Sequence, residues 1–285
     1  MARYEPVQLA FNSVDPEGCS KDKAPIIFVH GLTASKELWN DLPEITAKAT
    51  NRKVYAVDSR NHGDSPWCDV FNFDCNVDDL LHFMDSINAP KAIIIGHSMG
   101  GITGMKLALR APERVEKLVV EDMSCRKLSQ PMLDMVFLYI SLGRAALEQV
   151  PSDVDEDTAR KIIFDTVMQS LPQELKMLAR PDNTNFRIQL KRTPEGRWAF
   201  KSNVDLLMKA LKNSNELMSE PTGVYEGPSC FIYGKLSPFL VGLDEPNIRK
   251  HFPNAKMVGI DNATHSVHTE CPREFNDALL NFLQE

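Results

Sequence analysis

The sequence predicts an α/β protein with a mostly parallel central sheet, helices on both faces, and a helical segment inserted late in the sheet. Short apolar stretches rich in β-branched residues alternate with helical patterns up to residue 124, as in parallel strands joined by crossover helices. Over residues 125–220 the patterns are helical and no strand is convincing, and the alternation then resumes. We therefore expect a core formed by residues 1–124 and 221–285, and a helical cap formed by residues 125–220.

The individual elements follow from local patterns. Residues 7–14 alternate partly between apolar and polar side chains, which favours an edge strand. The remaining strand candidates are short and apolar, as in strands buried on both faces: Ile26–His30, Val54–Asp58, Ala92–Ile95, Val115–Glu121, Cys230–Tyr233 and Lys256–Ile260. Helical patterns occupy 36–49, 76–87, 99–110, 131–142, 157–170 and 244–252, and a last helix begins at Pro272, a residue suited to a first helical position.

The composition excludes several classes of function. The formal net charge of −7 disfavours nucleic acid as the main partner, because a polyanion would be repelled. No apolar run approaches the ~18 residues of a membrane span, and no signal peptide or long basic presequence is visible at the N-terminus. The six cysteines are scattered without zinc-ligand spacing. We expect an intracellular chain with reduced cysteines, no transmembrane segment, no metal site and no recognisable targeting sequence.

A glycine-rich turn carries the first candidate catalytic residue, Ser98. Residues 96–101 read GHSMGG, between an apolar strand pattern and the helical pattern at 102–109. A serine on such a strained strand-to-helix turn exposes its hydroxyl as a nucleophile, and small neighbours leave room for the turn. The alternative is an ordinary glycine-rich turn with an incidental serine. We predict that Ser98 is the nucleophile of an α/β-hydrolase fold, in which a cap follows the sixth strand.

An acyl-transfer site also needs two backbone N–H groups for the developing oxyanion. One is expected from Met99, directly after the nucleophile, and the other from Leu32, in the loop after the strand 26–30. His30 lies in the same loop. It could be read as a base, but its position at a strand end before the serine favours a role in bracing the loop.

The base of this fold lies in the loop after the last strand. Residues 262–268 read NATHSVH, and His265 is the predicted base, which takes the proton of Ser98 and delivers it to the leaving group. His268, three residues later, is expected to line the pocket, and its use as the base is the alternative. The other histidines are assigned to cap or surface positions.

The acid is less simple to assign. The usual place follows the strand 230–233, but the residue there is Ser237, which cannot stabilise an imidazolium as a carboxylate does. A second location is the end of the strand 115–121, where Asp122 follows Glu121. We predict Asp122 as the acid, with Glu121 pointing to the other face of the pleated strand. The alternative is an aspartate that merely ends the strand.

Several motifs together resemble the family of abhydrolase domain-containing protein 11, of the sn-1-specific diacylglycerol lipase type, and related bacterial esterases. They are HGL at 30–32, DSRNHGDSP at 58–66, GHSMGG at 96–101, VEDMS at 120–124 and the H-x-x-H pair at 265 and 268. The resemblance covers nearly the whole chain. It supports Asp122, because the family also lacks an aspartate at the Ser237 position. It brings in Asp205 as an alternative acid, whose other interpretation is a helix-start residue bonded to backbone amides.

The resemblance also implies a function. It predicts hydrolysis of carboxylic esters, including lipid esters such as diacylglycerol, without a cofactor, and it implies residence in mitochondria and association with the 2-oxoglutarate dehydrogenase complex. Ser266 and Thr264 stand where the family usually has Trp and Gly, which alters the expected pocket shape. Two alternatives stay open: a serine acyltransferase, and a hydrolase-fold protein that mainly binds and protects a mitochondrial 2-oxoacid dehydrogenase complex.

Overall fold

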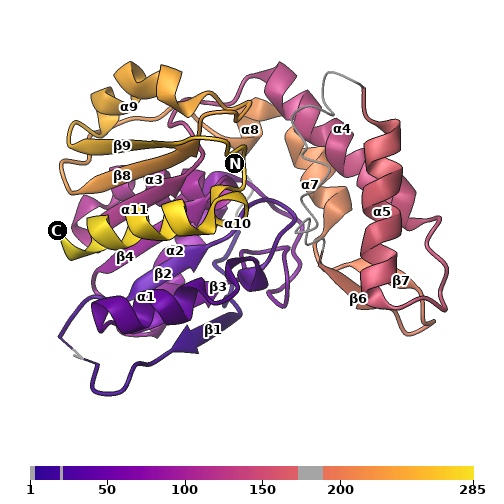
Figure 1. Ribbon diagram of the computed structural model, residues 1–285, viewed down its shortest axis with the longest axis horizontal. Coiled ribbons are helices and arrows are strands. Elements are labelled where there is room, and N and C mark those ends of the chain that lie inside the picture. The colour runs from indigo at the N-terminus through magenta and orange to yellow at the C-terminus, as the bar shows by residue number, and fades with distance from the viewer. Residues whose placement is uncertain (1–3, 20–21, 173–188) are drawn as a thin grey trace.

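The central feature of the computed structural model is a seven-stranded sheet of order β1-β3-β2-β4-β5-β8-β9 (Figure 1). The structure describes residues 4–19, 22–172 and 189–285. The strands are β1 Phe11–Val14, β2 Ile26–Val29, β3 Val54–Val57, β4 Ala92–His97, β5 Val115–Glu121, β8 Ser229–Gly234 and β9 Ala255–Ile260. β1 pairs antiparallel with β3 and the other pairs are parallel. The predicted α/β-hydrolase fold is confirmed.

Helices cover both faces of this sheet, as the prediction requires (Figure 1). One face packs against α2, α3 and α9 and the opposite face packs against α1 and α11. Their bounds are α1 Leu42–Thr50, α2 Phe73–Ser86, α3 Met99–Arg110, α9 Glu245–His251, α10 Val267–Glu270 and α11 Pro272–Gln284. Short 3₁₀ turns are η1 Lys36–Trp39, η2 Pro112–Arg114 and η3 Val241–Asp244.

The pleat of the strands divides their side chains between two apolar cores. In β4, Ile94 packs in the α2–α3 core, whereas Ile93 and Ile95 pack in the α1–α11 core. All three are fully buried, because a parallel sheet covered on both faces buries every side chain of its central strands. The same alternation in β5 sends consecutive residues to opposite faces, which later decides where its last two carboxylates point.

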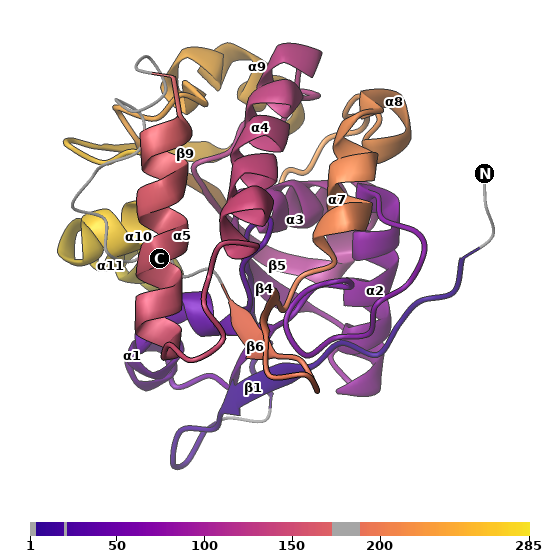
Figure 2. The ribbon, with the colours of Figure 1, turned by 90° about the vertical axis from the view of Figure 1, so that its right-hand side faces the viewer.

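The segment between β5 and β8 forms a cap beside the sheet, with α4 Gln130–Leu147, α5 Glu156–Ser170, α7 Val204–Leu211 and α8 Ser214–Leu217 (Figure 2). Its outer part has a small apolar core of its own, which joins α4, α5 and β6. Residues 173–188 of the predicted cap lie outside the described residues. Counted along this chain, the cap follows the fifth strand of the main sheet, not the sixth, because only β1 precedes β2 in the described part.

One prediction for the cap is wrong. Residues 125–220 were expected to contain no strand, yet β6 Leu190–Arg192 and β7 Trp198–Phe200 pair antiparallel. The hairpin is three residues long on each side, too short for a period-two pattern to stand out in the sequence. Its turn contains Gly196 with a positive φ of 77°, a conformation that glycine adopts without steric cost.

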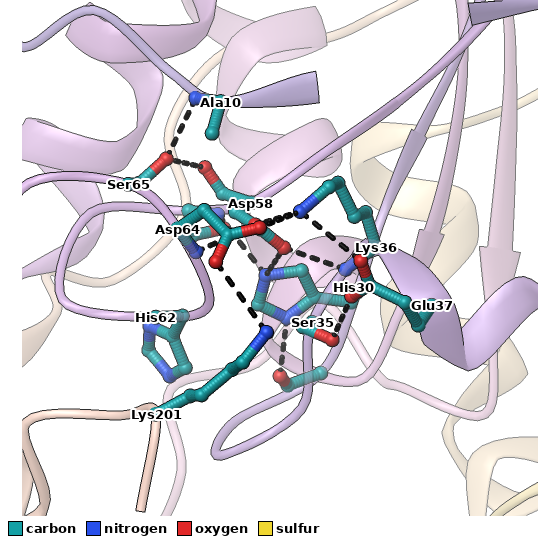
Figure 3. A network of polar contacts seen from close by, with 12 residues as sticks. Ala10, His30, Ser35, Lys36, Glu37, Asp58, His62, Asp64, Ser65 and Lys201 are labelled. Atoms are coloured by element: carbon teal, nitrogen blue, oxygen red, sulfur yellow. Dashed lines mark hydrogen bonds and ion pairs between the residues drawn. The ribbon is translucent and has the colours of Figure 1, made fainter. Parts of the chain in front are cut away.

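The loop after β3 ties the cap to the core. The N–H of Asn203 donates to the carbonyl of Asn61 (2.8 Å), and the indole N–H of Trp67 donates to the carbonyl of Lys201 (3.2 Å). The Lys201 ammonium also lies 3.4 Å from a carboxylate oxygen of Asp64 (Figure 3). With a fourth contact, from the side-chain amide of Asn203 to Oδ1 of Asn61 (3.2 Å), these bonds fix the start of α7 to the core. Within the described parts of the chain, no helix combines the length and the apolar character that a membrane crossing needs.

Candidate active site

Ser98 occupies a strained turn between β4 and α3. Its φ of 53° and ψ of −115° lie in a region that residues with a side chain rarely adopt. The turn closes because its neighbours lack side chains: a Cβ on Gly96 would lie 2.3 Å from the Gly100 carbonyl oxygen, and a Cβ on Gly100 would lie 2.0 Å from the Val29 carbonyl oxygen. The sequence thus needs both glycines to bring the serine to the carboxyl edge of the sheet.

Three side chains that are distant in the sequence form one hydrogen-bonded chain. The Ser98 hydroxyl lies 2.9 Å from Nε2 of His265, and Nδ1 of His265 lies 2.7 Å from Oδ2 of Asp122. With Nδ1 protonated, that nitrogen donates to the carboxylate and Nε2 is free to accept the serine proton. The arrangement has the connectivity of a nucleophile, a base and an orienting acid.

Asp122 lies directly after β5 and is fully buried, with a positive φ of 48°. Its Oδ1 accepts the N–H of Gly234 (3.0 Å), and its Oδ2 accepts the Ser237 hydroxyl as well as His265. Burial raises the pKa of Asp122, while the hydrogen bonds from His265, Ser237 and Gly234 act in the opposite direction. The serine at the usual position of the acid therefore serves as a donor to the carboxylate that takes its place.

The structure does not bring Asp205 to His265. Asp205 lies in the first turn of α7, its side chain is 70% exposed, and it forms an ion pair with Arg144 of α4 (2.9 Å). The cap of that helix is Asn203, whose side chain accepts the N–H of Leu206. Asp205 thus links two cap helices at the surface, and the proposed alternative acid has no geometric support.

The two expected oxyanion donors lie on either side of the nucleophile. Met99 is the first residue of α3, and first-turn N–H groups have no acceptor within their own helix. Leu32 follows Gly31, where an added Cβ would lie 3.3 Å from Cβ of Ser98. The loop at 30–33 therefore passes close to the nucleophile, as an oxyanion hole requires.

A buried polar network holds that loop in place (Figure 3). His30 donates from Nδ1 to the Gly31 carbonyl (2.7 Å) and accepts the Ser59 N–H at Nε2 (3.0 Å). Because both ring nitrogens are engaged and burial lowers its pKa to about 4, His30 is a neutral brace and not a base. Lys36, at the end of the same segment, contacts a carboxylate oxygen of Asp58 at 2.7 Å.

Lys36 and Asp58 are the centre of this network. The Lys36 backbone N–H also donates to Asp58 (2.6 Å), and its ammonium contacts Asp64 (2.6 Å). Burial alone would lower the pKa of Lys36, but these carboxylates raise it above its ordinary value. The ion pairs join the segment after β2 to the segment after β3. Sequence analysis missed them, because nothing in the spacing of Lys36 and Asp58 marks them as partners.

Several histidines lie elsewhere than the sequence predicts. His62 and His97 were assigned to cap or surface positions, yet both are buried, with exposed fractions of 0% and 6%. His268 was expected to line the pocket, but it is 7% exposed and bonded to Glu121. The prediction that Glu121 faces away from Asp122 is confirmed by this contact. The described residues contain no cluster of histidine, cysteine and carboxylate side chains able to hold a metal ion.

The chain is similar to known proteins over most of its length. The family model described as alpha/beta hydrolase fold matches residues 24–272. The chain is similar to "sn-1-specific diacylglycerol lipase ABHD11" of Danio rerio, at 31% identity over 100% of this chain and 85% of the relative. It is also similar to "Ethanol acetyltransferase 1" of Cyberlindnera fabianii, at 27% identity over 90% of this chain and 79% of the relative. A solved "Marine microorganism esterase" shares 28% identity with a TM-score of 0.76, covering 97% and 99% of the two chains.

Proposed function

This chain belongs to the α/β-hydrolase fold family, and we propose that it hydrolyses carboxylic esters through an acyl-enzyme on Ser98. The observation that carries the proposal is the unbroken chain of hydrogen bonds from Ser98 through His265 to the buried Asp122. A hydroxyl is a weak nucleophile at neutral pH and needs an adjacent base oriented by a third group. Ser98 supplies the hydroxyl, His265 the base and Asp122 the third group, and each of the two hydrogen bonds that join them is shorter than 3 Å.

The reaction proceeds in two halves. Ser98 Oγ attacks the acyl carbon while its proton moves to Nε2 of His265, and the carboxylate of Asp122 stabilises the imidazolium. The N–H groups of Leu32 and Met99 bind the oxyanion. The bond to the leaving alcohol then breaks, and Nε2 returns the proton to that alcohol. Water attacks the acyl-enzyme with the same base, which releases the acid and restores Ser98.

The substrate class we propose is an ester with an apolar acyl part, such as a lipid ester. Phe239 stacks on the ring of His265 with centroids 4.3 Å apart. Around it the segment after β8 exposes three leucines, Leu236, Leu240 and Leu243, at 54%, 57% and 77%. Exposed apolar side chains on the same segment as Phe239 favour a surface that meets an apolar ligand. A relative named as a diacylglycerol lipase is consistent with this class.

A second candidate reaction is transfer of the acyl group to an alcohol, favoured by the similarity to a protein named as an ethanol acetyltransferase. The same acyl-enzyme serves both reactions, because either water or an alcohol can attack it. Adding ethanol to an ester assay separates them. A hydrolase forms free acid in proportion to turnover, whereas a transferase forms ethyl ester as its main product at ethanol concentrations far below that of water. Mitochondrial residence and a dehydrogenase-complex partner stay predictions from the resemblance.

The proposed function is tested by active-site labelling with a fluorophosphonate probe, which forms a covalent adduct with an activated serine. We expect one adduct on the native chain, mapped to Ser98 by peptide mass spectrometry, and none on Ser98→Ala. A panel of p-nitrophenyl esters of increasing chain length then measures kcat/KM for each acyl group. A folded native chain that neither labels nor cleaves any of the esters would exclude an esterase.

A further inference from the structure

We propose that Glu121 and His268 are positioning residues for the reaction at Ser98: a second buried carboxylate–imidazole pair that holds the loop carrying His265. This inference rests on the proposed function, because a positioning role requires a reaction to position. In the sequence, Glu121 ends β5 one residue before Asp122, and His268 lies in α10 three residues after His265. It lies on the opposite face of the sheet.

The contacts within the pair are extensive. Both carboxylate oxygens of Glu121 lie close to Nδ1 of His268, at 2.7 and 2.8 Å, and the backbone N–H of His268 donates to the same carboxylate at 2.9 Å. Glu121 is fully buried, and His268 is packed between the rings of Trp39 and Phe275. The first turn of α10 is therefore bonded through both backbone and side chain to the end of β5.

A third buried residue connects the pair to the catalytic groups. His97, which pairs in register with Glu121 across β4 and β5, donates from Nε2 to the backbone carbonyl of His265 (3.0 Å). Its ring contacts those of both His265 and His268, with centroids 4.8 and 5.6 Å apart. The backbone carbonyl of Glu121 also accepts the N–H of Ser98 (3.0 Å). One strand end thus contacts the nucleophile directly and the base through His97 and His268.

Stability alone does not account for this pair. Burial by itself would raise the pKa of Glu121, but His268 and His97 beside it hold that pKa below its ordinary value, which favours the charged carboxylate. A buried polar pair of this kind often contributes no more to stability than well-packed apolar side chains of similar volume. The pair instead fixes a position. The Glu121 carboxylate holds His268 at the start of α10, and this fixes the place of the His265 ring, three residues before His268.

Small errors in that position have large effects on rate. The proton passes from Ser98 to His265 across 2.9 Å, and a misplacement of about 1 Å in such a geometry can cost about 100-fold. The expected oxyanion donors Leu32 and Met99 lie outside this loop, so we expect binding of the ester carbonyl to change less than proton transfer. Loss of the pair is therefore expected to lower kcat and leave KM nearly unchanged.

The test uses one set of variants of the full chain. His268→Leu keeps an apolar side chain against the aromatic rings but removes the donor, whereas His268→Asn keeps a donor nitrogen at the position of Nδ1. The double variant Glu121→Leu/His268→Leu removes the whole pair without leaving a buried charge. Tyr225→Phe is the matched control, because it removes a buried hydrogen bond, to the carbonyl of Val115 (3.2 Å), at the other end of β5, about 20 Å away.

We expect kcat of His268→Leu and of the double variant to fall by about 10- to 100-fold, with KM within threefold and fluorophosphonate labelling slowed in parallel. His268→Asn should recover kcat to within about fivefold of native, and Tyr225→Phe should leave kcat unchanged. A folded double variant with native kcat would overturn the proposal. If the leucine variants do not fold, His268→Phe decides, because it keeps a ring between Trp39 and Phe275 but has no donor nitrogen, and native kcat there gives the same negative answer. Failure of the native chain to label would instead refute the proposed function.

Discussion

Replacement of Asp122 by asparagine tests the third member of the proposed triad with little change in shape. Oδ1 of Asp122 accepts a backbone N–H from Gly234 at 3.0 Å, and Oδ2 accepts Nδ1–H of His265 at 2.7 Å. Asparagine has a single acceptor oxygen and a donor NH₂ group. Its oxygen must face the backbone N–H of Gly234, since that group cannot change its role, and its NH₂ group is then turned toward His265.

The consequence is a change of tautomer at the base. With a donor opposite it, Nδ1 must become the acceptor, and the ring proton moves to Nε2. A protonated Nε2 cannot take the proton of Ser98 across the 2.9 Å that separates them. In a serine protease triad the same replacement lowers kcat by about 10⁴-fold. We expect a loss of about 10²- to 10⁴-fold here, or about 3 to 6 kcal/mol at about 1.4 kcal/mol for each factor of ten.

The assay is steady-state hydrolysis of a p-nitrophenyl ester, with kcat and KM measured separately. Asp205→Asn is the matched control, because it makes the same chemical change at a carboxylate that is 70% exposed and paired with Arg144, and we expect its kcat to stay within twofold of native. The reasoning is refuted if Asp205→Asn loses activity while Asp122→Asn keeps it.

Three further predictions concern the groups around the triad. Ser237→Ala removes one hydrogen bond to the triad carboxylate and should lower kcat by about 3- to 10-fold, in line with about 1 kcal/mol for such a bond; unchanged kinetics would contradict this. Gly100→Ala places a Cβ 2.0 Å from a carbonyl oxygen of β2 and should lower the free energy of unfolding by about 3 kcal/mol or more, measured by urea denaturation; a loss below 1 kcal/mol would show that the turn can relax. Burial lowers the pKa of three histidines from 6.5, to about 4 for His30 and to about 3 for His62 and His97. Because the unfolded chain then binds more protons than the folded one below pH 6.5, stability is full above that pH and is lost as the pH falls, by at most about 1.4 kcal/mol per pH unit for each histidine; equal unfolding free energies at pH 7 and pH 5 would contradict the assignment.

The sheet and its order of elements could be predicted because each strand is a short apolar run, and runs of this kind are buried on both faces. The turn at Ser98 could be predicted for a related reason. A Cβ on Gly96 or Gly100 would lie only 2.3 or 2.0 Å from a backbone carbonyl oxygen, so the glycines in the local sequence encode the bend. The cap hairpin β6–β7 was missed because each strand has only three residues. It is stabilised by neighbours in the cap, not by its own pattern.

In the candidate site, too, some residues could be predicted from the sequence and their contacts could not. Residues with a fixed place in chain order, Ser98 and His265, could be named from the sequence, and the absence of a carboxylate at Ser237 directed attention to Asp122. The contacts between side chains distant in the sequence could not be predicted from it. The pairing of Glu121 with His268 joins positions 147 residues apart, and such contacts are decided by the pleat and by packing of the whole sheet. A histidine three residues after a predicted base and a glutamate just before a predicted acid were the available signals.

The two carboxylates that end β5 have a consequence for how this chain can diverge. Since a strand has a period of two, a shift of β5 by one residue would exchange their faces, so that Glu121 would meet the loop of His265 with a side chain one methylene too long. An insertion or deletion in β5 therefore exchanges the two carboxylates unless a bulge absorbs it, as the register shift opposite Ala92 and Ile93 does at the start of the strand. Directly after Asp122 the chain leaves the sheet and enters the cap, where added or lost residues disturb neither pair. If the proposed function holds, relatives can vary the cap while keeping both carboxylate–histidine pairs unchanged.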